Sequence, residues 1–307
     1  MLRIGSRGSK LALWQAQWVR SALERQGEHS EIEIIRTTGD NITDVSLARL
    51  GASTGVKGLF TKEIEEALLC GRIDLAVHSL KDMPVDLPGG LVLAAVPERE
   101  DARDVLVGST LARLPQNAKI GTSSLRRAAQ LRACRPDLVI EPLRGNIDTR
   151  LRKLDEGQYA GIVLAAAGLK RMGWEGRIAE LLPPEVMCPA VGQGALAIET
   201  RSDEGNARQA CRKLDHAQTR AAVTAERALL RLLGGGCQVP IGGHAVVEDG
   251  RVHLRAVVIS PDGRQIVRRE NSGAVAEAEH VGAELARDIL DAGARAILEV
   301  VYGTSGL

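Results

Sequence analysis

The strongest indication of the fold is the stretch Asp74-Leu75-Ala76-Val77-His78-Ser79-Leu80-Lys81-Asp82-Met83-Pro84. Its first half is a short apolar run, which is typical of a strand buried inside an α/β sheet. Its second half is a charged turn, and Pro84 prevents a regular continuation. Ligands of open α/β sheets bind at the carboxyl ends of the strands. The stretch therefore predicts an α/β fold with a binding site at Lys81 and Asp82.

Asp82 is the candidate catalytic residue of this turn. A carboxylate held in a cleft can stabilise a cation or move protons. The alternative is an ordinary turn aspartate, which is common in proline-containing loops. His78 fits a packed core histidine better than a base, and we assign it no role.

Two further stretches place a strand, a polar turn and a helix in succession. The strand Leu2 to Ser6 leads through Arg7 and Ser9 into a helix from about Leu11 to Gln26. Exposed backbone N–H groups at a helix N-terminus form a ready site for an anion. An ordinary surface arginine beside an N-cap serine is the alternative interpretation of this loop.

The second such stretch begins with the strand Lys119-Ile120-Gly121 and a cap at Thr122 to Ser124. Arg126 and Arg127 follow in the first helical turn, where cations oppose the helix dipole. This conflict suggests that both arginines face a bound anion, although a basic helix face is the alternative. A third strand, Leu138 to Leu143, ends in Arg144-Gly145-Asn146, and the helix after it carries Arg150.

The order of these patterns predicts three domains. Residues 1–97 and 195–213 form a first α/β lobe, because Leu196 to Thr200 is expected to pair back into the first sheet. Residues 101–188 form a second α/β lobe. Two crossings between the lobes imply a hinged cleft, as in periplasmic-binding-protein folds. Residues 216–307 form a small α+β domain with a three-stranded meander, whose turns contain Asp249-Gly250 and Asp262-Gly263.

The small domain contains a glycine-rich loop with a cysteine, Gly234-Gly235-Gly236-Cys237-Gln238-Val239-Pro240. A helix from Thr219 to Leu233 precedes it, and Gly234 is a plausible residue for its C-terminal cap. Three glycines permit backbone conformations that other residues avoid. We expect Cys237 on a tight, exposed loop, which suits a thiol that is modified. The alternative is a small buried hydrophobic residue, since free cysteines are usually buried and inert.

Composition excludes several classes of protein. The net charge of +1 gives no basic field for nucleic acid, and aromatic residues, at 2%, are too few for base stacking. No apolar run is long enough to span a bilayer. The 5 cysteines include no Cys-x-x-Cys pair, so neither a disulfide framework nor a metal site is expected. Because Met1 leads directly into a strand, we expect no signal peptide and a cytoplasmic protein.

Seven motifs along the chain together resemble the porphobilinogen deaminase (hydroxymethylbilane synthase) family. They are Gly5-Ser6-Arg7 with Leu11-Ala12-Leu13-Trp14, Lys57-Gly58-Leu59-Phe60, His78 to Pro84, Gly121-Thr122-Ser123-Ser124-Leu125-Arg126-Arg127, Leu143-Arg144-Gly145-Asn146, Val191-Gly192-Gln193-Gly194, and Gly235-Gly236-Cys237-Gln238-Val239-Pro240. The resemblance implies stepwise polymerisation of four porphobilinogen molecules with loss of ammonia, on a dipyrromethane cofactor joined to a cysteine by a thioether. The product is the linear tetrapyrrole hydroxymethylbilane.

The resemblance also implies roles for individual residues. The cofactor cysteine is Cys237, and the catalytic aspartate is Asp82, which stabilises the cation left when ammonia departs. Cofactor-binding positions are Ser79, Lys81, Asp82, Thr122, Ser124, Arg126, Arg127, Arg144 and Gly145. Substrate-binding positions are Arg7, Ser9, Arg49, Phe60, Arg144, Arg150 and Gln193. Many members have a lysine near the position of Arg49, and the loop around Ala52 to Thr54 is longer here.

Two other classes of protein compete with this interpretation. A non-catalytic, two-lobed anion-binding protein would explain the arginines and the hinge, but it gives Cys237 no role. A thiol enzyme would use Cys237 as a nucleophile, but no cysteine–histidine pairing is evident, since His244 is near only in sequence. No metal is expected, and the protein is expected to be a monomer.

Overall fold

The computed structural model describes residues 1–41, 60–235 and 239–302 of the chain. Contacts divide the chain into two compact units. The first unit is Met1–Glu100 with Ala195–Arg220, and the second is Asp101–Gly194 with Ala221–Leu307. The predicted three-domain division stays a prediction, as does the hinged cleft.

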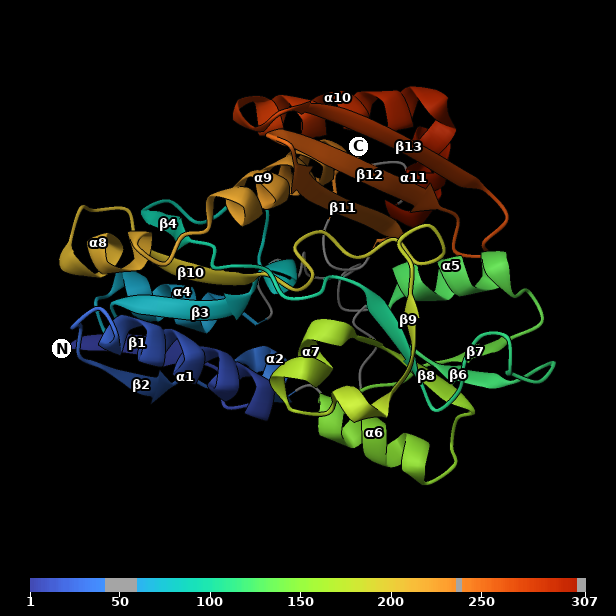
Figure 1. Cartoon of the computed structure of the whole chain (residues 1–307), viewed down its shortest axis with the longest axis horizontal. Helices are drawn as coiled ribbons and strands as arrows, with labels where there is room; N and C mark the ends of the chain where they lie inside the picture. Colours follow the sequence, from blue (N-terminus) through green and yellow to red (C-terminus); the bar gives the residue numbers. More distant parts are fainter. Residues whose placement is uncertain (42–59, 236–238, 303–307) are drawn as a thin grey trace. The chain divides into compact units, whose positions relative to one another are not determined.

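The first unit contains a mixed five-stranded sheet in the order β2-β1-β3-β10-β4 (Figure 1). Its strands are β1 (Leu2–Ser6), β2 (Ser30–Ile34), β3 (Leu75–Ser79), β4 (Leu91–Ala95) and β10 (Leu196–Arg201). β1 runs parallel to β2 and β3, whereas β10 is antiparallel to both β3 and β4. The predicted return of residues 196–200 to the first sheet is therefore confirmed, and β10 lies between strands that precede it by about a hundred residues.

Helices around this sheet are α1 (Lys10–Glu24), α2 (Thr38–Asn41), α4 (Lys62–Leu69) and α8 (Asn206–Arg212). α1 packs on β1, β2 and β3, and it buries Ala16, Val19 and Leu23 against Ile4 and Leu75. This apolar spacing of three and four residues along α1 is the pattern of a helix with one face in the core.

The second unit contains another mixed five-stranded sheet, in the order β7-β6-β8-β5-β9. Its strands are β5 (Asp104–Val107), β6 (Lys119–Gly121), β7 (Val139–Glu141), β8 (Gly161–Ala165) and β9 (Ile178–Leu182). The accompanying helices are α5 (Leu125–Cys134), α6 (Ile147–Asp155) and α7 (Ala166–Arg171). β5 and β9 pair antiparallel to each other, and β5 also pairs with β8.

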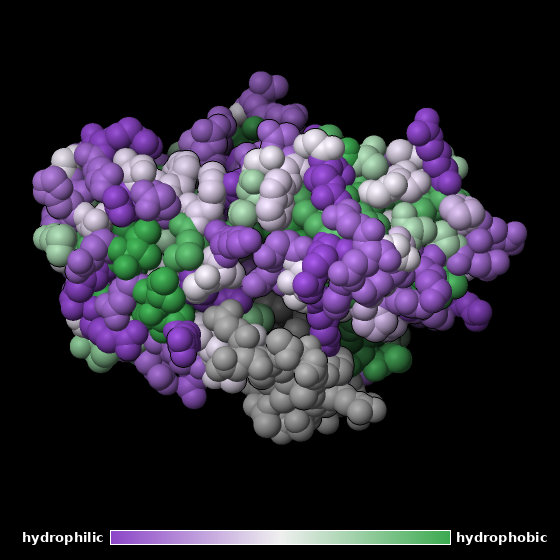
Figure 2. Space-filling model, turned by 90° about the horizontal axis from the view of Figure 1, so that it is seen from below, coloured by the Kyte–Doolittle hydropathy of each residue, from purple (hydrophilic) through white to green (hydrophobic). Residues whose placement is uncertain are grey.

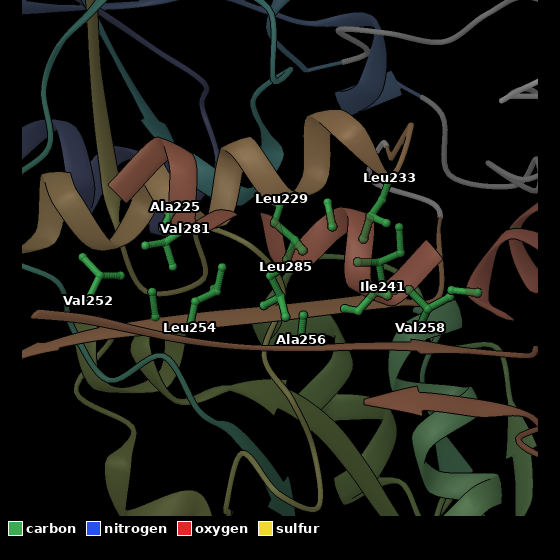
Figure 3. Packing of buried hydrophobic residues seen from close by; sticks show 14 of the residues in the cluster. Ala225, Leu229, Leu233, Ile241, Val252, Leu254, Ala256, Val258, Val281 and Leu285 are labelled. Atoms are coloured by element: carbon green, nitrogen blue, oxygen red, sulfur yellow. The ribbon is translucent and has the colours of Figure 1, made fainter. Parts of the chain in front are cut away.

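The same unit contains the predicted meander, with β11 (Ile241–Glu248), β12 (Arg251–Ile259) and β13 (Ile266–Ala274). One face of this sheet packs on α9 (Ala217–Leu232) and α10 (Ala278–Ile289), and Figure 3 shows side chains of these helices directed at β12. Leu229 and Leu285 are buried against Leu254 and Ala256. Gly234 has the positive φ predicted for the residue after α9, and so does Gly263 in the second turn.

Two helix ends depart from regular geometry. Thr61 is the N-cap residue of α4, but its side chain makes no capping hydrogen bond. The helical segment that follows α10 is interrupted at Gly293, which has φ +102, and α11 (Arg295–Tyr302) follows.

Within the described part of the chain, no helix is long and apolar enough to cross a membrane. Figure 2 shows mostly hydrophilic side chains on the face that it draws, with small separate hydrophobic areas. In the first unit, an apolar hollow lies between α1 and β2 and is lined by Leu13, Trp14, Trp18, Ile32 and Ile34.

Candidate active site

Asp82 lies in a single 3₁₀ turn, Leu80–Asp82, directly after the buried strand β3. The backbone N–H of Leu80 donates to the carbonyl of Ala195 at 3.0 Å, which fixes the turn against the start of β10. The side chain of Asp82 is half-buried, and it has no hydrogen bond or ion pair to any residue that the structure describes. Asp74, at the other end of β3, instead pairs with Arg3 at 3.0 Å. The negative charge of Asp82 is thus left for another partner.

The end of β3 is held in place by buried polar contacts. Gln15 of α1 is buried, and its Nε2 donates to Ser79 Oγ at 2.9 Å. His78 is also buried and lies 3.1 Å from Glu199 Oε2 of β10, as expected of a packed core histidine. Because buried polar groups need partners, these contacts favour one position for the turn that carries Lys81 and Asp82.

The loop after β1 brings two predicted substrate-binding residues together. Ser9 is the N-cap of α1, and its Oγ accepts from the backbone N–H of Ala12 at 3.3 Å. The guanidinium of Arg7 lies over the ring of Phe60, 4.3 Å from its centroid. Such a cation–π contact orients the planar guanidinium on the ring face. The ring thereby gives Arg7 a defined orientation.

In the second unit, Ser124 is the N-cap of α5, and the two hydroxyl residues before it bond within the same turn or to the neighbouring strand end. Ser124 Oγ accepts from the backbone N–H of Arg127 at 3.4 Å, and Thr122 Oγ1 accepts from that of Ser124 at 3.2 Å. Ser123 Oγ donates to the carbonyl of Leu143 at 2.9 Å. These bonds fix the turn between β6 and α5, so the first turn of α5 has a defined position.

Arg126 and Arg127 of that turn are buried and bind a carboxylate that the sequence analysis missed. Arg126 Nη1 donates to Asp104 Oδ2 at 2.6 Å, and Arg127 Nη2 donates to Asp104 Oδ1 at 2.7 Å. Asp104, the first residue of β5, is fully buried. The alternative of a basic helix face in solvent is therefore wrong. Burial acts to raise the pKa of Asp104, but the two guanidiniums outweigh it and hold that pKa well below its usual range.

Gln193 belongs to the same cluster. It is buried, and its Nε2 donates to Asp104 Oδ1 at 3.0 Å and to the carbonyl of Ala102 at 2.7 Å. Three residues that the sequence analysis placed in the site, Arg126, Arg127 and Gln193, thus share one carboxylate. The signal for Asp104 was weak, because its strand has only four residues and a polar segment precedes it.

The loop before α6 joins Gly145 to Arg150. Arg150 Nε donates to the carbonyl of Gly145 at 2.7 Å. Gly145 has φ +108, and a Cβ at this position would lie 2.8 Å from Thr149 Cγ2, so the loop requires glycine here. Arg144 and Arg150 are both half-buried. The predicted residues Cys237 and Arg49 lie outside the described residues.

Comparison with known proteins settles the family. The model for "Porphobilinogen deaminase, dipyromethane cofactor binding domain" matches residues 2–209, and that for "Porphobilinogen deaminase, C-terminal domain" matches residues 220–291. The chain belongs to the porphobilinogen deaminase family. The porphobilinogen deaminase of Syntrophobacter fumaroxidans is 52% identical over 307 residues, which cover 98% of each chain. That of Pelobacter propionicus is 51% identical over 305 residues, covering 98% of this chain and 97% of that protein.

Solved structures of lower similarity are periplasmic solute-binding proteins. A substrate-binding protein of an ABC transporter from Coxiella burnetii has a TM-score of 0.44 and 15% identity, over 70% of this chain and 92% of that chain. A TRAP solute-binding protein from Desulfovibrio salexigens has a TM-score of 0.40 and 10% identity, over 70% of this chain and 72% of that chain. The predicted fold class, with two α/β sheets and a small C-terminal α+β part, is confirmed by the strand order of this deaminase family member itself.

Proposed function

We propose that the chain is a transferase that joins four porphobilinogen molecules head to tail, with loss of ammonia, to give hydroxymethylbilane for tetrapyrrole and heme biosynthesis. Family membership over nearly the whole length carries this proposal, because both domains of the family are matched in order. The half-buried carboxylate of Asp82, without a partner among the described residues, supports it from the geometry.

The residues of the site fit a cofactor that bears several carboxylates. Arginine binds carboxylates through paired, charge-assisted hydrogen bonds. In Arg126, only Nη1 donates hydrogen bonds to protein acceptors. Its Nε–H and Nη2 N–H groups have no partner among the described residues. We therefore propose that the dipyrromethane cofactor is held by Ser79, Lys81, Asp82, Thr122, Ser124, Arg126, Arg127, Arg144 and Gly145, and joined to Cys237 by a thioether. When bound, the cofactor supplies the pyrrole end to which units are added.

Asp82 is the proposed catalytic residue. Departure of ammonia from porphobilinogen leaves positive charge on the pyrrole. A carboxylate already in position stabilises such charge without reorganising at the moment of reaction. Asp82 also accepts the proton that the attacking pyrrole carbon loses as each bond forms. Its place at the end of a rigid strand favours both roles.

The remaining residues bind the substrate in this proposal. Porphobilinogen carries an acetate and a propionate, which pair with Arg7, Arg144 and Arg150. Ser9 donates a further hydrogen bond, Gln193 contributes through its carbonyl oxygen because both of its N–H groups bond Asp104 and Ala102, and Arg49 contributes from the segment outside the described residues. Phe60 holds the guanidinium of Arg7 flat, which supports a fixed orientation of its N–H groups toward a carboxylate.

The experiment is turnover of porphobilinogen by the purified protein, combined with its intact mass and its colour with Ehrlich's reagent. We expect uroporphyrin absorbance after product oxidation, and a mass that exceeds the sequence mass by one dipyrromethane. A protein that carries no pyrrole and consumes no porphobilinogen would contradict the proposal.

A non-catalytic anion-binding protein is not favoured, because residues 220–291 match a domain of the deaminase family. We further propose a cytoplasmic monomer that binds no nucleic acid.

A further inference from the structure

Asp104 is the centre of a buried charge cluster, and it is the one member of that cluster to which the proposed function gives no role. Its Oδ1 accepts from Arg127 Nε at 2.9 Å, from Arg127 Nη2 at 2.7 Å and from Gln193 Nε2 at 3.0 Å. Its Oδ2 accepts from Arg126 Nη1 at 2.6 Å. The carboxylate and the side chains of both arginines are each more than nine-tenths buried. Asp104 therefore fixes three side chains in one place.

The charges of this cluster do not balance. Two guanidiniums and one carboxylate sum to +1, and no other carboxylate pairs with either arginine among the described residues. The cluster also lies at the N-terminal turn of α5, where the helix dipole adds positive potential. Because a buried charge without compensation is costly, this arrangement favours a bound anion.

The two arginines differ in how many guanidinium N–H groups remain without a protein acceptor among the described residues. Arg127 directs three N–H groups to Asp104 and Val163, whereas Arg126 directs only Nη1, to Asp104 and to the carbonyl of Cys188 at 2.6 Å. Arg126 thus keeps Nε–H and one complete Nη2 group on the other edge of its guanidinium. That edge matches the two oxygens of a carboxylate.

We propose that Asp104 is a positioning residue, which orients Arg126 so that its free edge binds a carboxylate of the pyrrole chain, first of the cofactor during assembly and then of the incoming porphobilinogen during turnover. Asp104 acts through Arg126, while Arg127 and Gln193 hold Asp104 itself in place. The proposal rests on the proposed function, since that function supplies the carboxylate. It differs from a structural ion pair, which would affect stability and leave recognition of the ligand unchanged.

The test compares Asp104→Asn with Asp101→Asn in the purified, cofactor-loaded protein. Asp101 lies three residues earlier and bonds Arg103 at 2.7 Å, so the control removes the same charge from an arginine pair outside the site. Wild-type turnover is measured first, because its absence would refute the proposed function alone. Loading of each variant is established by intact mass, and KM and kcat refer to the loaded fraction.

We expect Asp104→Asn to raise KM for porphobilinogen by about ten- to a hundred-fold, the value of one misplaced charge-assisted bond, with a much smaller change in kcat. Asp101→Asn should keep the wild-type KM. In an Arg126→Leu background, the change from Asp104 to Asn should no longer raise KM, because the residue through which it acts is missing. A wild-type KM in Asp104→Asn, or the same rise in KM with and without Arg126, would overturn the proposal.

If Asp104→Asn does not fold, Asp104→Glu answers the same question. It keeps the charge, but the extra methylene moves the carboxylate and so displaces the guanidinium of Arg126. We expect a folded protein with a raised KM. A folded Asp104→Glu protein with the wild-type KM would show that the orientation of Arg126 has no effect on binding.

Discussion

Asp82 differs in its bonding from two other aspartates that lie at strand ends. Asp74 and Asp104 each pair with arginines, whereas Asp82 has no pairing partner among the described residues. The charge of a paired carboxylate is directed at its arginine partners and so orients protein side chains. The carboxylate of Asp82, which has no such partner among the described residues and lies in a half-buried turn, can direct its negative charge at a ligand. The distinction could not be made from sequence, because all three aspartates lie at strand ends.

Replacing Asp82 tests whether its negative charge is needed for turnover. Asp82→Asn keeps the shape but removes the charge, so turnover by the loaded enzyme should fall on the order of 10²–10³-fold. Asp82→Glu keeps the charge in a displaced position and should retain more activity than Asn. Loading, verified by mass, should persist in both. Wild-type turnover by Asp82→Asn would identify Asp82 as a turn residue only.

Cys237 gives a second prediction at this scale. Cys237→Ser removes the only sulfur of the Gly-Gly-Cys loop and should yield a folded protein that carries no covalent pyrrole and has no activity. Intact mass, circular dichroism and turnover measure the three properties. Cys211→Ser, which changes a buried cysteine of α8, is the matched control and should keep its pyrrole. A fully active Cys237→Ser protein would contradict the anchoring role.

At the level of elements, α9 and α10 approach closely at Gly282. A Cβ at Gly282 would overlap the carbonyl oxygen of Ala225 and crowd Ala228. Gly282→Ala should therefore push the helices apart and lower the free energy of unfolding by about 1–3 kcal/mol, as overpacking usually does. Urea denaturation of the wild type and the variant measures this difference in the free energy of unfolding. Gly176→Ala, where an added Cβ meets nothing within 4 Å, is the control and should be neutral. Equal stability of the two variants would contradict the close packing.

Local rules predicted the elements that depend on neighbouring residues. The N-cap at Ser9, the glycine after α9 and the three strands of the meander all follow from periodicity and cap chemistry within a few residues. β5, β9 and α7 were missed because each has only four to six residues, too few for a clear periodic pattern. Within the site, the bond from Asp104 to Arg126 spans 22 residues and depends on which strands are neighbours in the sheet. No local pattern contains that information.

At the scale of the whole molecule, paired aspartates determine the response to acid. The hydrogen bond from Arg103 lowers the pKa of Asp101 to about 2, and the pKa values of Asp74 and Asp104 are also lowered. A carboxyl whose pKa is lower in the folded state stabilises the fold above its unfolded pKa, near 3.8. That contribution disappears as the pH falls through the folded value.

We therefore expect the free energy of unfolding to decrease as the pH falls from about 4 toward 2. Asp101→Asn should make this decrease smaller, because one of the titrating groups is gone. Urea denaturation at pH 5.5 and at pH 3, on wild type and variant, measures the difference. An identical pH dependence for both proteins would show that the Asp101 pair contributes nothing to stability in acid.

The position of β10 has a consequence for how the chain is made. β3 and β4 have left the ribosome soon after residue 95 is translated, but β10, which must lie between them, ends at Arg201. At 5–20 residues per second, the nascent chain waits roughly 5–20 s for this strand. During that interval β4 and one edge of β3 are unpaired templates for other chains. Slow translation of residues 101–195 would lengthen this exposure and with it the time in which two nascent chains can pair through these edges.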